Sequence, residues 1–224
     1  MTRLSDLTWP EVGAMAGRSA LLVPVGATEQ HGPHLPCTVD TDIAVALCER
    51  VAASRADVVL APPVAYGSSG EHAGFPGTLS LGQAATELLL VELVRSADSF
   101  AGVVLVSAHG GNRAPVRRAV SRLRAEGRRV AAWEPSGPAD DSHAGFTETA
   151  VLLALRAGAV RADLVAAGNT APLPELIDRL RARGVRAVSP GGVLGDPRGA
   201  TADDGERLLA AWSAELAAAV DGVR

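Results

Sequence analysis

One stretch of the chain, residues 23–42, gathers more side chains of the metal-ligand type than any other window of similar length. Glu29 and His31 lie two residues apart, just beyond an apolar run at residues 21–25. Side chains two apart point to the same side of an extended segment, so both can face one ligand. Prolines and a glycine then turn and stiffen the chain, which lets Asp40 return to the same space. The stretch predicts the floor of a metal site.

The histidines of the chain are all expected in loops, each within two residues of a glycine or proline. There are five, at positions His31, His34, His72, His109 and His143. A single histidine of this kind would more often be a packed or capping residue. Since none falls in the predicted helices, the joint pattern favours a shared site.

A hydrolytic two-metal site needs imidazoles and carboxylates, one of them bridging ions about 3.5–4 Å apart. Glu29, His31, Asp40 and His109 can supply these groups. We expect Asp40 to bridge, because a carboxylate has two oxygens and this one ends a proline-containing loop. The alternative for Asp40 is a helix N-cap, for which Asp42 is better placed. The alternative for His109 is a tight strand-to-helix turn, which is compatible with a metal role.

Other chemistries find little support in the sequence. There is no G-x-S-x-G elbow, no P-loop and no G-x-G-x-x-G after a strand. The chain contains no lysine, which excludes a lysine nucleophile or Schiff base. Cys37 lies in the ligand stretch and could be a thiol nucleophile, but a buried small residue is the favoured interpretation. Two cysteines cannot form a disulfide framework.

Composition excludes several further classes of protein. The net charge is −4, and no basic stripe is present, which argues against nucleic acid as a partner. No apolar run could span a bilayer and no secretory leader is visible, so we expect no membrane association and a cytoplasmic location.

The elements that must position these residues alternate along the chain. Apolar runs predict strands at residues 21–25, 58–61, 103–106 and 129–133. Helical patterns cover residues 4–17, 42–54, 83–100, 113–126, 173–183 and 203–220, and the segment 143–148 opens a further helix that runs to residue 156. The glycine-rich segment 65–78 is too irregular for either and is expected to be a functional loop. The pattern predicts an α/β protein with a mostly parallel sheet covered on both faces, formed by a single domain over residues 1–224.

Five motifs together resemble the creatininase (creatinine amidohydrolase) family. They are Gly26-Ala-Thr-Glu-Gln-His-Gly-Pro-His34, Asp40-Thr-Asp42, Phe75-Pro-Gly-Thr78, His109-Gly-Gly-Asn112 and His143-Ala-Gly-x-x-Glu-Thr149. The resemblance covers nearly the whole chain, in order. Softer stretches at 65–72, 167–174 and 192–197 resemble a subgroup that cleaves a modified precursor peptide.

The resemblance implies a three-layer α/β/α sandwich and two divalent metal ions per subunit, which could be Zn, Fe or Mn. By position, Glu29, Asp40 and His109 would hold one ion, and His31 with Asp40 the other. In creatininase a glutamate two residues after the strand-end histidine ligates the second metal, but here that position is Gly111. We expect Glu148 to fill the gap. The alternative for Glu148 is an acidic residue that is favourable at a helix N-terminus.

The expected reaction is hydrolysis of an amide by metal-activated water, with His143 and Glu71 as catalytic residues. Tyr66, His72 and Asn112 are expected on the substrate side, although Tyr66 could equally be a packing residue. The subgroup resemblance implies release of a Val-Tyr-derived C-terminal unit from a modified precursor peptide.

Alternatives to a peptidase remain open at this point. They are a cyclic-amide or formamide hydrolase with the same ligands, and a structural metal clip in an assembly. Asp141 and Ser142 stand where creatininase has Trp and Glu before its catalytic histidine, which weakens the case for creatinine. The family resemblance also suggests a homo-oligomer, in which segment 189–201 covers the site of a neighbouring subunit.

Overall fold

The computed structural model describes residues 1–223, and in them five strands form one parallel sheet. The strands are β1 (Thr2–Arg3), β2 (Ala20–Val25), β3 (Val58–Leu60), β4 (Gly102–Ser107) and β5 (Val130–Trp133). Their order is β1-β3-β2-β4-β5, and every neighbouring pair is parallel. The carboxyl ends of the central strands β2 and β4 therefore lie side by side, where open α/β sheets bind their ligands.

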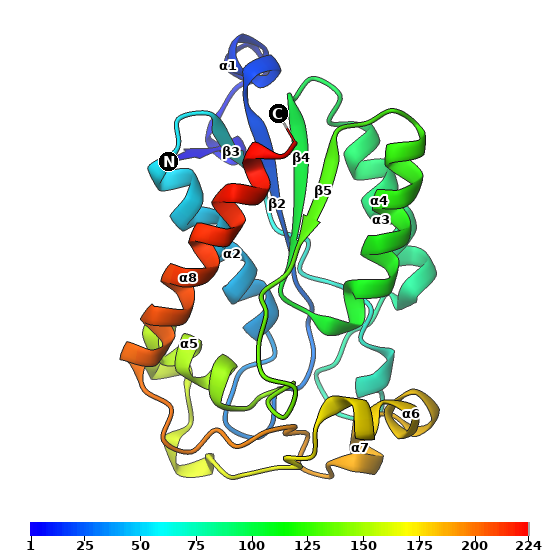
Figure 1. Cartoon of the computed structure of the whole chain (residues 1–224), viewed down its shortest axis with the longest axis vertical. Helices are drawn as coiled ribbons and strands as arrows, with labels where there is room; N and C mark the ends of the chain where they lie inside the picture. The colour runs from blue at the N-terminus through cyan, green and yellow to red at the C-terminus, as the bar shows by residue number, and fades with distance from the viewer. Residues whose placement is uncertain (224) are drawn as a thin grey trace.

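Helices cover both faces of the sheet, which gives three layers (Figure 1). One face carries α2 (Val39–Ser54), α5 (Phe146–Arg156) and α8 (Ala202–Asp221), and the other carries α3 (Gly82–Arg95) and α4 (Arg113–Ala125). Alternation explains how one strand serves both layers: Leu22 of β2 packs in the first core, and Leu21 and Val23 pack in the second. The predicted three-layer α/β/α sandwich is confirmed.

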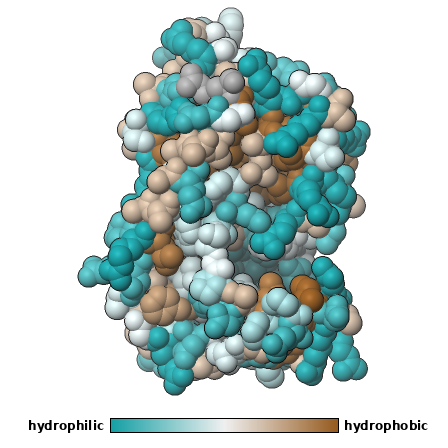
Figure 2. All heavy atoms as spheres, viewed as in Figure 1, coloured by the Kyte–Doolittle hydropathy of each residue, from teal (hydrophilic) through white to brown (hydrophobic). Residues whose placement is uncertain are grey.

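A smaller apolar cluster lies at the end of the molecule beyond the carboxyl ends of the strands. It is formed by α6 (Leu173–Arg183), α7 (Val185–Val188) and Leu194 (Figure 1). The Arg186 guanidinium donates to the backbone carbonyl of Gly74 at 2.8 Å and lies 5.5 Å from the centre of the Phe75 ring. These contacts tie α7 to the glycine-rich loop. In the view of Figure 2 the surface is mostly hydrophilic, with small hydrophobic patches, and the outline narrows above this end.

One element boundary changes the position of a predicted ligand. Helix α2 begins at Val39 after Thr38, so Asp40 lies in its first turn and not at the end of a loop. The expectation that Asp42 caps this helix is also wrong. Thr38 occupies the N-cap position, and the Thr38 hydroxyl donates to the Asp42 carboxylate at 3.0 Å. Both acids therefore lie at the positive end of the helix dipole, and Asp40 is held by the helix itself.

Other boundaries differ from expectation at the ends of elements. The first predicted helix is shorter, α1 (Trp9–Met15), and is flanked by 3-10 turns at Leu4–Asp6 and Ala16–Arg18. Helix α3 ends at Arg95, and α5 begins only at Phe146 because the Asp141 carboxylate accepts the amide protons of the first turn, at residues 146 and 147. Strand β1 and helix α7 were not predicted, since elements this short show no periodicity. The remaining 3-10 turns are Gly70–His72, Gly110–Asn112, Ala157–Ala159 and Ala162–Leu164.

None of the helices within residues 1–223 is both long and apolar enough to cross a membrane.

Candidate metal centre

Four of the five predicted ligands come from three neighbouring parts of the fold. Glu29 and His31 lie on the loop after β2, and Asp40 lies in the first turn of α2. His109 lies two residues after Ser107, the last residue of β4. A glycine allows the close approach of the loop and the helix, because a Cβ at Gly26 would lie 2.2 Å from the Thr41 hydroxyl oxygen. Parallel pairing of β2 with β4 then places the His109 ring beside the same loop.

Asp40 lies between two histidines and faces each with a different oxygen. Its Oδ1 lies 3.3 Å from Nε2 of His31, and its Oδ2 lies 3.4 Å from Nδ1 of His109. His109 also approaches Glu29, with 3.2 Å between Nε2 and Oε2. A carboxylate with one oxygen on each side is suited to bridge two ions.

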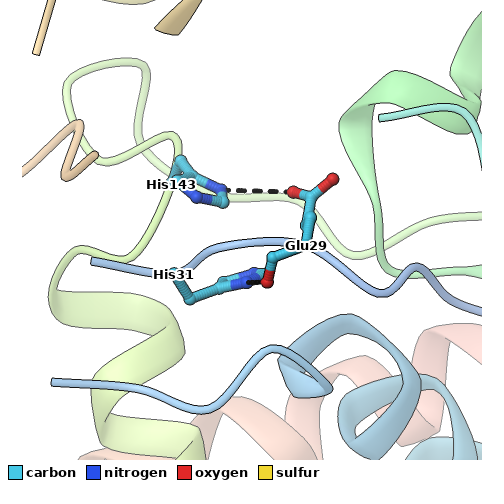
Figure 3. A group of neighbouring side chains, drawn as sticks. All are labelled: Glu29, His31 and His143. Atoms are coloured by element: carbon cyan, nitrogen blue, oxygen red, sulfur yellow. Dashed lines mark hydrogen bonds and ion pairs between the residues drawn. The ribbon is translucent and has the colours of Figure 1, made fainter. Parts of the chain in front are cut away.

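The ring of His31 presents a lone pair to the carboxylates. Its Nδ1 donates to the backbone carbonyl of Glu29 at 3.1 Å (Figure 3), which leaves Nε2 as the free acceptor of the neutral ring. Nε2 lies 3.3 Å from Asp40 and 3.8 Å from Oε2 of Glu148. A ring nitrogen that faces two carboxylates needs a metal ion or a proton between them, and a backbone carbonyl on the other ring nitrogen is a usual partner of a metal-binding histidine.

Three buried carboxylate oxygens of the described residues accept no hydrogen bond: both oxygens of Glu29, and Oδ2 of Asp40. Buried polar atoms are almost always satisfied, so these oxygens require a cation or a proton. Two groups of atoms, each within 4.8 Å of one another, could hold ions, namely Glu29-Asp40-His109 and His31-Asp40-Glu148. Asp40 belongs to both groups. The residues present therefore fit a pair of divalent ions.

Glu148 reaches the cluster from the first turn of α5. Its Oε2 accepts the amide proton of Ala144 at 2.5 Å, and its side chain is 18% exposed. Ala144 has a φ of 52°, in the left-handed region that costs a non-glycine residue energy. The Asp141 carboxylate already accepts the amide protons at the start of α5, so Glu148 is free to point toward His31.

His143 and His72 lie against the same cluster but outside both Asp40 groups. Nδ1 of His143 lies 3.7 Å from Oε1 of Glu29 (Figure 3), and Nε2 of His72 lies 3.2 Å from the same oxygen. The centres of the two rings are 4.4 Å apart. His143 could also join Glu29 and His31 in a third group of suitable spacing. Of the five histidines, four converge on the site. His34 is the exception, and its Nε2 lies 2.9 Å from the hydroxyl of Thr149.

The residues expected on the substrate side occupy different places. Tyr66 is 49% exposed, and its ring does not take part in the buried cluster. The Asn112 carboxamide is engaged at both ends, accepting from Ser68 N–H and donating to the Gly26 carbonyl, each at 2.9 Å. Asn112 therefore joins the glycine-rich loop to the end of β2. His72 is buried and lies inside the cluster.

The charges of the cluster shift several pKa values. Burial raises the pKa of Glu29 to about 8 and that of Glu148 to about 7. Burial opposes protonation of His31, but Asp40 and Glu148 outweigh it and raise its pKa to about 10. Without a metal, protons therefore neutralise these groups, and metal binding must displace them.

His72 and His143 shift in the other direction. Burial and the positive charges of His109 and His31 lower the pKa of His72 to about 3. Burial and the charge of His31 hold the pKa of His143 well below its usual value. Both rings are therefore neutral at pH 7.

Sequence reasoning missed Gln30. It lies between Glu29 and His31, and alternation along an extended segment would turn it away from them. This segment is not a strand, and the Gln30 carboxamide nitrogen lies 2.9 Å from Nδ1 of His72.

Comparisons with known proteins identify the family of the chain. The family model described as creatinine amidohydrolase matches residues 5–220. The chain belongs to the creatininase family. A mycofactocin precursor peptide peptidase of Mycolicibacterium smegmatis is 55% identical over 197 residues, covering 85% of this chain and 79% of the relative. The creatinine amidohydrolase of Pseudomonas putida is 30% identical, covering 92% of this chain and 91% of the relative.

Solved creatininase structures share the fold. A manganese form of creatininase superposes with a TM-score of 0.81 at 28% identity, covering 98% of this chain and 97% of the other. A Zn-Zn form of a creatininase mutant gives 0.79 at 27% identity, covering 97% and 96%. The protein is thus a hydrolase of the creatininase family, and relatives in this family contain divalent metals.

At Gly111 the chain departs from creatininase, and the space of the missing side chain is filled by another residue. A Cβ at Gly111 would lie 2.3 Å from Oε1 of Glu71 and 2.4 Å from Nε2 of His109. Oε1 of Glu71 lies 3.8 Å from that nitrogen. The absent side chain thus leaves room for a carboxylate from the glycine-rich loop, on the His109 side of the site, while Glu148 lies on the His31 side.

Proposed function

We propose that this protein is a metal-dependent peptidase that cleaves a modified mycofactocin precursor peptide and releases its C-terminal Val-Tyr-derived unit. One observation carries the choice of substrate. Mycobacterial relatives named mycofactocin precursor peptide peptidase are 49–55% identical over 85–91% of the chain, against 30% for a creatinine amidohydrolase. The Asp141-Ser142 pair, where creatininase has Trp and Glu, also favours a substrate other than creatinine.

The proposed cofactor is a pair of divalent ions. Glu29, Asp40 and His109 would hold one, and His31, Asp40 and Glu148 the other, with Asp40 bridging. The three buried carboxylate oxygens without a hydrogen bond support this assignment. Mixed imidazole and carboxylate ligands suit Zn, Fe or Mn. Bound there, such ions lower the pKa of water and polarise a carbonyl group.

The side chains around the ions would move protons and hold the peptide. His143 is neutral, and its Nδ1 points into the site beside Glu29, so it can accept a proton from the attacking water and pass it to the leaving amine. Glu71 would act as a second proton carrier on the His109 side, where its half-open position gives contact with solvent. Tyr66 is exposed, and we assign it to peptide binding outside the cluster.

Two alanine variants test the proposal. His109→Ala should lose metal and activity together, because it removes a ligand. His143→Ala should keep the metal and lower kcat by about 10²–10⁴-fold, as expected for loss of a general acid or base. Metal content is measured by elemental analysis and cleavage by mass spectrometry of the modified peptide.

Substrate choice is tested by offering the wild-type enzyme creatinine, a cyclic amide, a formamide and the modified peptide. Cleavage of the peptide alone supports the proposal. Hydrolysis of a small amide without peptide cleavage would favour the alternative, and undiminished peptide cleavage by both alanine variants would contradict the metal mechanism.

We further propose a homo-oligomer located in the cytoplasm. Helix α3 has exposed leucines at 88, 89 and 93, an apolar strip that a second copy could cover. Light scattering coupled to size-exclusion chromatography measures the assembly, and a purely monomeric protein would contradict this part.

A further inference from the structure

The side chain of Gln30 lies between the two histidines outside the Asp40 groups. Its Nε2 is 2.9 Å from Nδ1 of His72, 3.0 Å from Nε2 of His143 and 3.1 Å from the carbonyl oxygen of Gly192. The backbone carbonyl of the same residue lies 2.8 Å from Nε2 of His143. One residue therefore contacts both rings, with a side-chain donor and a main-chain acceptor.

Backbone groups determine the orientation of the carboxamide. Its Oε1 accepts the amide proton of Gly32 at 2.8 Å, and its Nε2 faces the Gly192 carbonyl, which can only accept. A flipped amide would place two oxygens against each other at Gly192 and two donors against each other at Gly32. The carboxamide nitrogen is thus the group that faces His72.

The protons can be counted from this orientation. An amide nitrogen has two protons for three neighbours, and Gly192 takes one. The Gln30 main-chain carbonyl can only accept, so Nε2 of the neutral His143 ring satisfies it by donating. The second amide proton is then left for Nδ1 of His72. In this arrangement His72, the Gly192 carbonyl and the Gln30 carbonyl each form one hydrogen bond, and the 3.0 Å approach of the carboxamide nitrogen to Nε2 of His143 is not one. Placing the second proton on His143 instead leaves the Gln30 carbonyl without a donor.

We propose that Gln30 is a positioning residue that gives the rings of His72 and His143 opposite roles. Its side chain keeps the His72 proton on Nε2, and its main chain keeps the His143 proton on Nε2 with Nδ1 free. Since His72 points Nε2 and His143 points Nδ1 at Glu29, the first presents an N–H to the site and the second a lone pair. His72 is then a hydrogen-bond donor, and His143 accepts a proton. The catalytic meaning of this arrangement rests on the proposed function, but the arrangement itself does not.

Nitrogen NMR of the metal-free protein tests the proton positions directly. Long-range proton–nitrogen spectra of histidine-labelled protein show which ring nitrogen carries the proton, and five histidines are few enough to assign with His72→Gln and His143→Gln. We expect wild-type protein to protonate Nε2 in both rings. In Gln30→Glu an ionised carboxylate can only accept, so above the pKa of the new side chain Nδ1 of His72 should become protonated while His143 keeps its pattern.

A second variant reaches the same carboxamide without changing residue 30. A Cβ at Gly192 would lie 2.0 Å from Oε1 of Gln30, so Gly192→Ala should displace the amide. The proton of His72 should then no longer be confined to Nε2. Gly199→Ala is the matched control, since Gly199 has a φ of 79° against 82° at Gly192 and its Cβ meets nothing within 4 Å. We expect the control to keep the wild-type spectrum. For the modified peptide, kcat should fall about 10–100-fold in Gln30→Glu, with KM changing less.

The outcomes separate this inference from the proposed function. A proton on Nδ1 of His72 in wild-type protein, or an unchanged His72 in folded Gln30→Glu and Gly192→Ala, would overturn the positioning role. If the protein shows the expected proton positions but cleaves no peptide, the positioning role stands and the proposed substrate is wrong. A simple packing role would disturb both rings together, which also contradicts the proposal.

Discussion

At the scale of single residues, the site is a set of buried acids that protons neutralise where cations are missing. Burial raises the pKa of Glu29 to about 8, and His31 reaches about 10 through Asp40 and Glu148, which outweigh its burial. A buried acid normally changes its protonation before it remains charged and unpaired. Protons and metal ions therefore compete for the same atoms.

The first prediction concerns the pH dependence of metal affinity. Below a pKa of about 10, His31 carries a proton that the metal must displace, so affinity should rise with pH. The expected slope from pH 6 to 9 is about tenfold in Kd per pH unit for each proton released. Calorimetry in buffers of different ionisation enthalpy counts the protons. A Kd that does not change over this range would contradict proton displacement.

The second prediction distinguishes the two interpretations of Glu148, a metal ligand or an acid that only stabilises a helix N-terminus. If it is a ligand, Glu148→Gln should lower the bound metal from two ions to one, because Glu29, Asp40 and His109 remain. Glu175 is the matched control, an exposed acid in the first turn of α6. Each substitution should cost about 0.3–1 kcal/mol of stability through the helix dipole. Full metal content in Glu148→Gln would leave only the helix-end role.

At the scale of elements, two short 3-10 turns bring loop residues into the site, one within the glycine-rich loop and one after β4. The turn Gly70–His72 carries Glu71 and His72, and the turn Gly110–Asn112 follows β4. The glycine-rich loop approaches the second turn where Gly111 lies against the carbonyl of Ser68, since a Cβ at Gly111 would lie 2.2 Å from that oxygen. Helix α7 supports the first turn from the other side through Arg186. A loop of this length is held by contacts that the strand pattern does not encode.

Adding one methyl group at this contact should separate the two turns. Gly111→Ala should push Glu71 and the His109 ring apart and lower kcat about 10–100-fold, the usual effect of disturbing groups around metal ligands. Gly110→Ala is the control, because its Cβ meets nothing within 4 Å. Peptide cleavage and thermal unfolding of both variants are the measurements. Equal activity of the two variants would show that the reaction does not depend on the position that Glu71 takes beside Gly111.

At the scale of the whole molecule, the parallel sheet supports a site to which the β2 loop, α2, β4 and α5 each contribute. A pair of ions held this way would link one helical layer, through α2 and α5, to the ends of β2 and β4. Binding to the folded state alone adds about 2.7 kcal/mol when the free metal is at a hundred times its Kd. For a protein of this size that corresponds to about 5–10 °C in Tm.

Chelation should therefore lower the thermal stability. EDTA followed by dialysis should lower Tm by this amount, and Zn or Mn should restore it, as measured by calorimetry. The His109→Ala variant should show little response to either treatment. A wild-type Tm that does not change on chelation would indicate that the cluster holds no ion that contributes to folding.

The sequence by itself determined the fold class, the family and the residue types of the site. Apolar runs of strand length are readable because both faces of a parallel sheet are buried, and Glu29, His31, Asp40 and His109 follow them at motif spacing. Tertiary structure decided what depends on contacts between distant segments. It placed Asp40 inside α2, turned Glu148 toward His31, left Tyr66 at the surface and filled the space at Gly111 with Glu71. It also determined the partners of Gln30, because the role of a carboxamide depends on which donors and acceptors the fold places around it.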